Sequence, residues 1–66
     1  MNMLYIRSKE HLEAVIAVND SVNKSQKAGL SIIKAIQEAR TVGQKIDPSF
    51  TAQDAIFCTR ALYNGD

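Results

Sequence analysis

The stretch SQKAGLSIIKAIQEARTVG, residues 25–43, decides how the rest of the chain can fold. At 3.6 residues per turn, its apolar and small residues fall on one side of a helix: Gly29, Ile32, Ile33, Ile36, Ala39 and Gly43. Its polar residues fall on the opposite side: Lys27, Lys34, Glu38 and Thr41. This separation predicts an amphipathic helix. Gly29 and Gly43 lie seven residues on either side of Ile36, so we expect a second helix to approach closely along that row.

The seven-residue spacing continues on both sides of this stretch. One row contains Val15, Val22, Gly29, Ile36 and Gly43, and a second contains Val18, Ser25, Ile32, Ala39 and Ile46. Both rows keep their phase through the polar residues 19–21, where a turn of arbitrary length would usually break it. The sequence therefore predicts one long helix over residues 8–44, with a kink or break allowed at 19–29. The alternative is a helical hairpin in which residues 19–21 end one helix and cap the next.

Capping residues mark the ends of the expected helices. Ser8 is suited to start the long helix, because its hydroxyl can accept a hydrogen bond from a free amide of the first turn. Gly43 is suited to end that helix in the left-handed conformation, and Pro48 prevents it from continuing. The segment 51–54, Thr-Ala-Gln-Asp, resembles a capping box with Asp in the usual Glu position. It predicts a second helix over residues 51–63 that folds back beside the first.

A chain of 66 residues is near the lower limit for independent folding, and a core of this size seldom supplies more than about 3–5 kcal/mol. The single cysteine excludes an internal disulfide, and one histidine far from it argues against a structural zinc site. We therefore expect residues 1–66 to form one all-α domain, a helical-bundle homo-oligomer and most simply a dimer, with residues 1–7 as an extended arm. The expected oligomer interface contains Val15, Val18, Val22, Gly29, Ile32, Ile36 and Gly43, with Ile56, Phe57 and Leu62 covering one flank.

The residues that most often carry catalysis do not form a recognisable site. His11 has no second histidine three or four residues away, and we interpret it as a solvated surface residue rather than a metal ligand or general base. Cys58 has no base or cation on the same helix face, so we expect a buried thiol that acts as a small hydrophobe. The acidic residues are dispersed, and the glycines form no phosphate-binding loop. The sequence thus predicts a non-enzymatic protein without a metal or cofactor.

The charges are almost balanced, because eight basic and seven acidic side chains give a formal net charge of +1. Neither half of the chain forms the strongly basic block typical of nucleic-acid-binding proteins. The leading hypothesis is a stoichiometric interaction protein, meaning an adaptor, inhibitor or regulator that covers the surface of an unidentified protein partner. The second hypothesis is nucleic-acid or nucleotide binding by a dimer, through a sparse basic track of Lys24, Lys27 and Arg40.

The longest uninterrupted apolar segment, residues 14–18, is far shorter than the ~20 residues that a membrane-spanning helix needs. The first residues lack the features of a signal peptide, and a lone free thiol fits a reducing compartment. We therefore expect a cytoplasmic location and no membrane contact.

Overall fold

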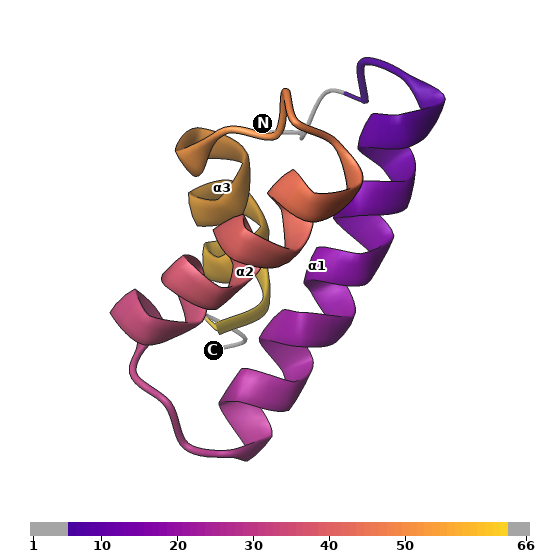
Figure 1. The fold of residues 1–66 in the computed structure, drawn as a ribbon. Coiled ribbons are helices and arrows are strands. Elements are labelled where there is room, and N and C mark those ends of the chain that lie inside the picture. The colour runs from indigo at the N-terminus through magenta and orange to yellow at the C-terminus, as the bar shows by residue number, and fades with distance from the viewer. Residues whose placement is uncertain (1–5, 64–66) are drawn as a thin grey trace.

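The computed structural model describes residues 6–63, which fold into three α-helices (Figure 1). α1 spans Lys9–Lys27, α2 spans Ile32–Ile46 and α3 spans Ala52–Tyr63. α1 and α2 form a helical hairpin, and α3 folds back so that each helix contacts both others. No strand occurs among the described residues, so the all-α prediction is confirmed for this part of the chain. Residues 1–5 of the predicted extended arm lie outside the described residues.

The helix predicted over residues 8–44 is interrupted, and the interruption begins at the end of the range 19–29 in which a kink or break was allowed. The chain leaves α1 at Lys27 and enters α2 at Ile32, so the break lies at residues 28–31. The hairpin alternative is correct in kind, but its turn is not at residues 19–21, which lie inside α1. Apolar residues recur every seven positions on both sides of the turn because both helices face the same core. Periodicity alone therefore does not distinguish two helices from one long helix.

A Schellman motif ends α1. Gly29 adopts a φ of +78°, the left-handed conformation that glycine reaches without a steric penalty. Its N–H donates to the carbonyl of Gln26, and the N–H of Leu30 donates to the carbonyl of Ser25, both at 3.0 Å. Ser31 then caps α2, because its Oγ accepts a backbone N–H of the first turn at 3.2 Å.

We expect Gly29→Ala to destabilise the fold by about 1 kcal/mol, because an L side chain is strained at positive φ. A Cβ at this position would meet nothing within 4 Å, so the penalty comes from the backbone alone. The same observation corrects the expectation that Gly29 permits close helix approach. Urea unfolding followed by circular dichroism measures the effect. Gly29→Asn should lose less stability, since asparagine tolerates the left-handed region; an alanine variant as stable as the parent would contradict this role.

The capping expected at Ser8 and in segment 51–54 is confirmed. Ser8 Oγ accepts the backbone N–H of His11 at 3.1 Å. At the start of α3, the Asp54 N–H donates to Thr51 Oγ1 at 3.1 Å, and the Thr51 N–H donates to Asp54 Oδ2 at 3.0 Å. These reciprocal bonds form a capping box in which the shorter Asp takes the place of Glu.

Gly43 lies inside α2, so its expected role as the left-handed closing residue is wrong. The last residue of α2 is Ile46, and Asp47 is its C-cap. The backbone of Asp47 is extended, as is usual for a residue before proline. Gly43 instead makes room for the ring of Phe50, because a Cβ at position 43 would lie 2.6 Å from Phe50 Cγ. The close approach expected at Gly43 therefore exists, but a side chain of the following loop makes it.

The buried core lies between the three helices and consists mainly of small side chains. Phe50 is the largest fully buried side chain, with 1% of its surface exposed. The other buried apolar residues in contact with it or with one another are Ala14, Val15, Val18, Val22, Ala39, Ala55 and Cys58. Because these residues are small, close packing of the helices around one aromatic ring fills the interior.

Candidate functional site

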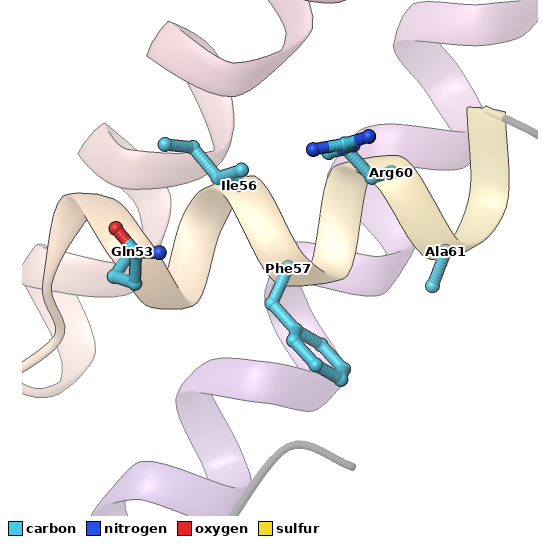
Figure 2. A pocket seen from close by; sticks show the side chains of 5 residues that line it. All are labelled: Gln53, Ile56, Phe57, Arg60 and Ala61. Atoms are coloured by element: carbon cyan, nitrogen blue, oxygen red, sulfur yellow. The ribbon is translucent and has the colours of Figure 1, made fainter. Parts of the chain in front are cut away.

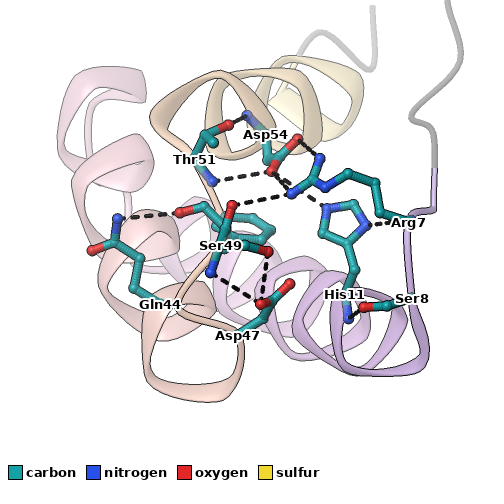
Figure 3. Close-up of polar contacts among 9 residues, drawn as sticks. Arg7, Ser8, His11, Gln44, Asp47, Ser49, Thr51 and Asp54 are labelled. Atoms are coloured by element: carbon teal, nitrogen blue, oxygen red, sulfur yellow. Dashed lines mark hydrogen bonds and ion pairs between the residues drawn. The ribbon is translucent and has the colours of Figure 1, made fainter.

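A group of polar side chains joins the start of α1 to the start of α3 (Figure 3). Arg7 Nη2 donates to Asp54 Oδ2 at 2.9 Å, and Arg7 Nη1 lies 3.4 Å from Asp54 Oδ1. His11 Nε2 lies 3.3 Å from the same Asp54 Oδ2. One carboxylate therefore ties together residues that are 43 and 47 positions away in the sequence.

His11 is completely buried, and its interpretation as a solvated surface residue is wrong. Its ring packs against the ring of Phe50, with the centroids 5.9 Å apart. Nδ1 accepts the backbone N–H of Arg7 at 3.3 Å, which assigns the ring proton to Nε2, where it is donated to Asp54. Both ring nitrogens are thus bonded within the fold and no substrate can reach them, so His11 serves the structure.

Asp54 is ionised in the fold at neutral pH. Burial alone raises the pKa of this carboxyl, but hydrogen bonds from Arg7 and the Thr51 N–H, together with the charge of Arg7, outweigh burial. They lower the pKa of Asp54 from 3.8 to about 2. The hydrogen bond to Asp54 likewise raises the pKa of Arg7. The Arg7 side chain is 41% exposed and that of Asp54 only 9%, so water screens one end of the pair.

The polar group continues along the loop between α2 and α3. Asp47 Oδ1 accepts the Ser49 Oγ–H at 2.8 Å and the Ser49 N–H at 3.0 Å, and these bonds lower the pKa of Asp47. Arg7 Nη2 donates to the carbonyl of Ser49 at 3.1 Å. Gln44 Nε2 donates to the carbonyl of Phe50, also at 3.1 Å. The network therefore holds the loop that inserts Phe50 into the core.

This group contains Ser, His and Asp side chains but not the hydrogen bonds of a Ser–His–Asp triad. The Ser49 hydroxyl donates to Asp47 and not to His11. Cys58 is 4% exposed, and burial raises the pKa of its thiol to about 11, which confirms the predicted buried thiol. Among the described residues, no cluster of three His, Cys, Asp or Glu side chains could hold a metal ion.

The residues expected at an oligomer interface differ in how far the fold of one chain buries them. Those buried within the chain itself are Val15, Val18, Val22 and Gly43. Ile32 and Ile36 are half-buried, and Gly29 is exposed in the turn. Ile33, which the helical pattern placed on the inward side, is 67% exposed. α2 buries the row of Ala35, Ala39 and Gly43 instead, and Ile33 lies well outside it.

The basic residues of the second hypothesis, Lys24, Lys27 and Arg40, are all exposed. Lys24 Nζ pairs with Asp20 Oδ2 at 3.2 Å, at i,i+4 spacing, and both side chains are mostly exposed. A shallow hollow between α1 and α2 contains Lys24 together with Asp20 and Glu38, so its charge is mixed. Lys27 and Arg40 do not line this hollow.

The outer side of α3 forms a partly apolar surface, which we call the α3 stripe (Figure 2). It consists of Gln53, Ile56, Phe57, Arg60 and Ala61. Ile56 and Phe57 are half-buried, and the other three are exposed. This surface was not predicted from the sequence, because Ile56 and Phe57 were expected to cover a flank of the core. The signal was present, since positions i, i+3, i+4, i+7 and i+8 share one face of a helix.

Two further large apolar side chains are exposed on α1. Leu12 is 44% exposed and Ile16 is 62% exposed. They are four residues apart, so they lie one turn apart on the same side of the helix. The buried row of α1 faces the other helices, and this pair therefore lies outside the core.

No protein-family model, curated protein or solved structure matches this chain. Within residues 6–63, no helix is long and apolar enough to cross a membrane. We therefore infer function from which side chains the fold encloses and which it leaves on the surface.

Proposed function

We propose that this chain is a small, non-enzymatic interaction protein that acts as an adaptor, inhibitor or regulator by covering the surface of another protein. One observation supports this proposal: the fold encloses its chemically versatile side chains and leaves large apolar ones outside. His11 and Cys58 are buried, whereas Ile16 and Ile33 are 62% and 67% exposed. The protein acts stoichiometrically, as a homo-oligomer, in the cytoplasm.

Leu12 and Ile16 form the apolar part of the proposed partner-binding surface. Complete burial of one such side chain contributes about 1.5–3 kcal/mol, and roughly half of each is already covered in the free chain. Covering the remainder of both would contribute roughly 1.5–3 kcal/mol, or about 10–150-fold in affinity. Asn19 and Asn23 continue the same side of α1 and are exposed, so they are placed to donate and accept hydrogen bonds at the rim.

The charges beside Lys24 favour a protein partner over a nucleic acid. An exposed lysine that already has an acidic neighbour, such as Lys24 beside Asp20, offers little net positive charge to a phosphate. The hollow next to this pair also includes Glu38, which repels anions.

Ile16→Asp should reduce partner binding about 30-fold or more, because a charged side chain would have to be desolvated in an apolar contact. The experiment is cross-linking capture with the tagged full chain in a lysate of the organism that encodes it, followed by titration of the captured protein. Binding should saturate at a fixed molar ratio, as expected for a protein that acts by contact.

Gln37→Glu is the matched control, since it adds the same charge to an exposed position on another helix, α2. It should capture the partner as well as the parent does, provided that circular dichroism shows equal helicity for both variants. Equal capture by Ile16→Asp and the parent would exclude this surface. Catalytic turnover of a substrate by the parent chain would overturn the non-enzymatic assignment.

A further inference from the structure

The hydrogen bonds of the buried His11 ring fit only one protonation state (Figure 3). A backbone N–H is always a donor, so Nδ1, which lies 3.3 Å from the backbone nitrogen of Arg7, must be unprotonated. Asp54 is ionised and can only accept, so Nε2, which lies 3.3 Å from its Oδ2, must carry the proton. The fold therefore selects a neutral His11 with its proton on Nε2.

A proton added to Nδ1 would remove the hydrogen bond from the Arg7 backbone. Two N–H groups would then point at each other across 3.3 Å, and the described residues offer Nδ1 no other hydrogen-bond partner. Water cannot reach this nitrogen, because His11 is 0% exposed. Protonation of His11 and the observed position of the Arg7 backbone therefore exclude each other.

The same proton would also repel the Arg7 side chain. Arg7 Nη2 and His11 Nε2 share Asp54 Oδ2, at 2.9 Å and 3.3 Å. Protonation of the ring places a second cation at this oxygen, and like charges disfavour each other. The Arg7 side chain is 41% exposed and that of His11 is 0% exposed, so Arg7 is the residue that can move into water.

The charges around the ring allow the three helices to stay packed when the ring is protonated. Asp54 on α3 and Asp47 in the loop between α2 and α3 are the nearby carboxylates, and Glu10 precedes the ring on α1 with an exposed side chain. Arg7 is the nearby cation. In the part of the chain that the structure describes, no charged side chain of α2 is hydrogen-bonded or ion-paired to the ring. Asp54 and Asp47 therefore offset the added charge inside the fold.

We propose that His11 is a proton-controlled latch for the segment that precedes α1. Neutral His11 holds the Arg7 backbone, and protonated His11 releases Arg7 while the helices stay packed. Arg7 also donates to the carbonyl of Ser49 at 3.1 Å, so its release removes one of the bonds that hold the loop between α2 and α3. The latch responds to mild acid, since histidine is the side chain that ordinarily titrates between about pH 5 and about pH 8.

Heteronuclear NMR of the full chain from about pH 8 to about pH 5 tests the latch. At the higher pH, the ring nitrogen signals should show the proton on Nε2. As the ring is protonated, the backbone N–H signal of Arg7 should move with the same midpoint and its heteronuclear NOE should fall. The signal of Ala39, which is 0% exposed in α2, should stay unchanged. A ring proton on Nδ1 at the higher pH, a ring that stays neutral throughout, or an Arg7 signal that ignores the titration would overturn the proposal.

The competition must be reciprocal, because the proton and the seated Arg7 exclude each other. Arg7→Gln removes the charge but keeps the backbone N–H, so the His11 ring signals should be half-titrated about 0.5 pH unit higher than in the parent. Arg7→Pro also removes the N–H and should move this midpoint further. Lys9→Gln is the matched control, since it removes an exposed cation of the first turn of α1 and should move the midpoint by less than about 0.2 pH unit. Equal midpoints in the parent and both Arg7 variants would refute the latch.

His11→Asn shows whether the ring itself senses the proton. Asparagine keeps an acceptor for the Arg7 N–H but has no group that titrates in this range. The Arg7 signal of a folded His11→Asn chain should therefore not respond to pH, and a response equal to that of the parent would assign the effect to another group. The Arg7 variants decide the question if asparagine unfolds the chain.

Discussion

Phe50→Ala should leave most of the chain unfolded at 25 °C. Phe50 is 1% exposed and is the largest side chain in a core that otherwise contains mainly alanine and valine. Removing a buried phenylalanine costs about 3–5 kcal/mol, which equals the stability expected for a domain of this length. Circular dichroism in urea measures the loss. Phe57→Ala is the matched control and should lose clearly less, because Phe57 is only half-buried at the surface of α3.

The contact between Phe50 and Gly43 provides a second test of the same packing. In the parent, Gly43→Ala should destabilise by about 1–3 kcal/mol, because the new methyl group would overlap the ring. In the Phe50→Ala background, the overlap is gone and alanine is the better helix former by about 1 kcal/mol. Gly43→Ala should then stabilise what remains of the fold. Additive effects of the two substitutions would show that the ring does not pack on this glycine.

Asp54→Ala should destabilise the fold by about 3 kcal/mol. The substitution removes the acceptor of the capping box, worth about 1 kcal/mol, and leaves the buried Nε2–H of His11 without a partner, at a cost of about 1–3 kcal/mol. Asp20→Ala is the control, since the exposed pair with Lys24 contributes less than about 0.5 kcal/mol. Equal losses of unfolding free energy from the two substitutions would show that the hydrogen bonds of Asp54 do not stabilise the fold.

The same carboxylate should make stability depend on pH in the acid range. The pKa of Asp54 is about 2 in the fold, below its ordinary 3.8, so the unfolded chain binds the proton more readily. The stabilisation is therefore complete above about pH 4 and is lost as the pH falls towards 2. Its size is about 1–2 kcal/mol, reduced by solvent at the partly exposed Arg7. In Asp54→Asn, urea unfolding at a series of pH values should show a flatter dependence over this window.

The helical class and most of the helix ends were predictable, because both depend on interactions within one turn. Ser8 accepts the N–H of His11, three residues further on, and Thr51 and Asp54 accept each other's N–H. Pro48 restricts only its neighbours. The break at Gly29 also had a local signal, a glycine followed two residues later by a capping serine. The prediction gave more weight to the seven-residue rows than to this local signal. Periodicity does not distinguish one long helix from two shorter ones that face the same core.

The sequence by itself determined that this chain is helical, where α3 begins, and that Cys58 is enclosed. Only the tertiary structure decided that His11 is buried and that Asp54 binds Arg7. It also decided that Gly43 receives an aromatic ring and that the outer side of α3 stays uncovered. The physical reason is the range of the forces concerned. Caps and periodicity act between residues a few positions apart, whereas the Arg7–Asp54 pair joins residues 47 positions apart and exists only once three helices have packed.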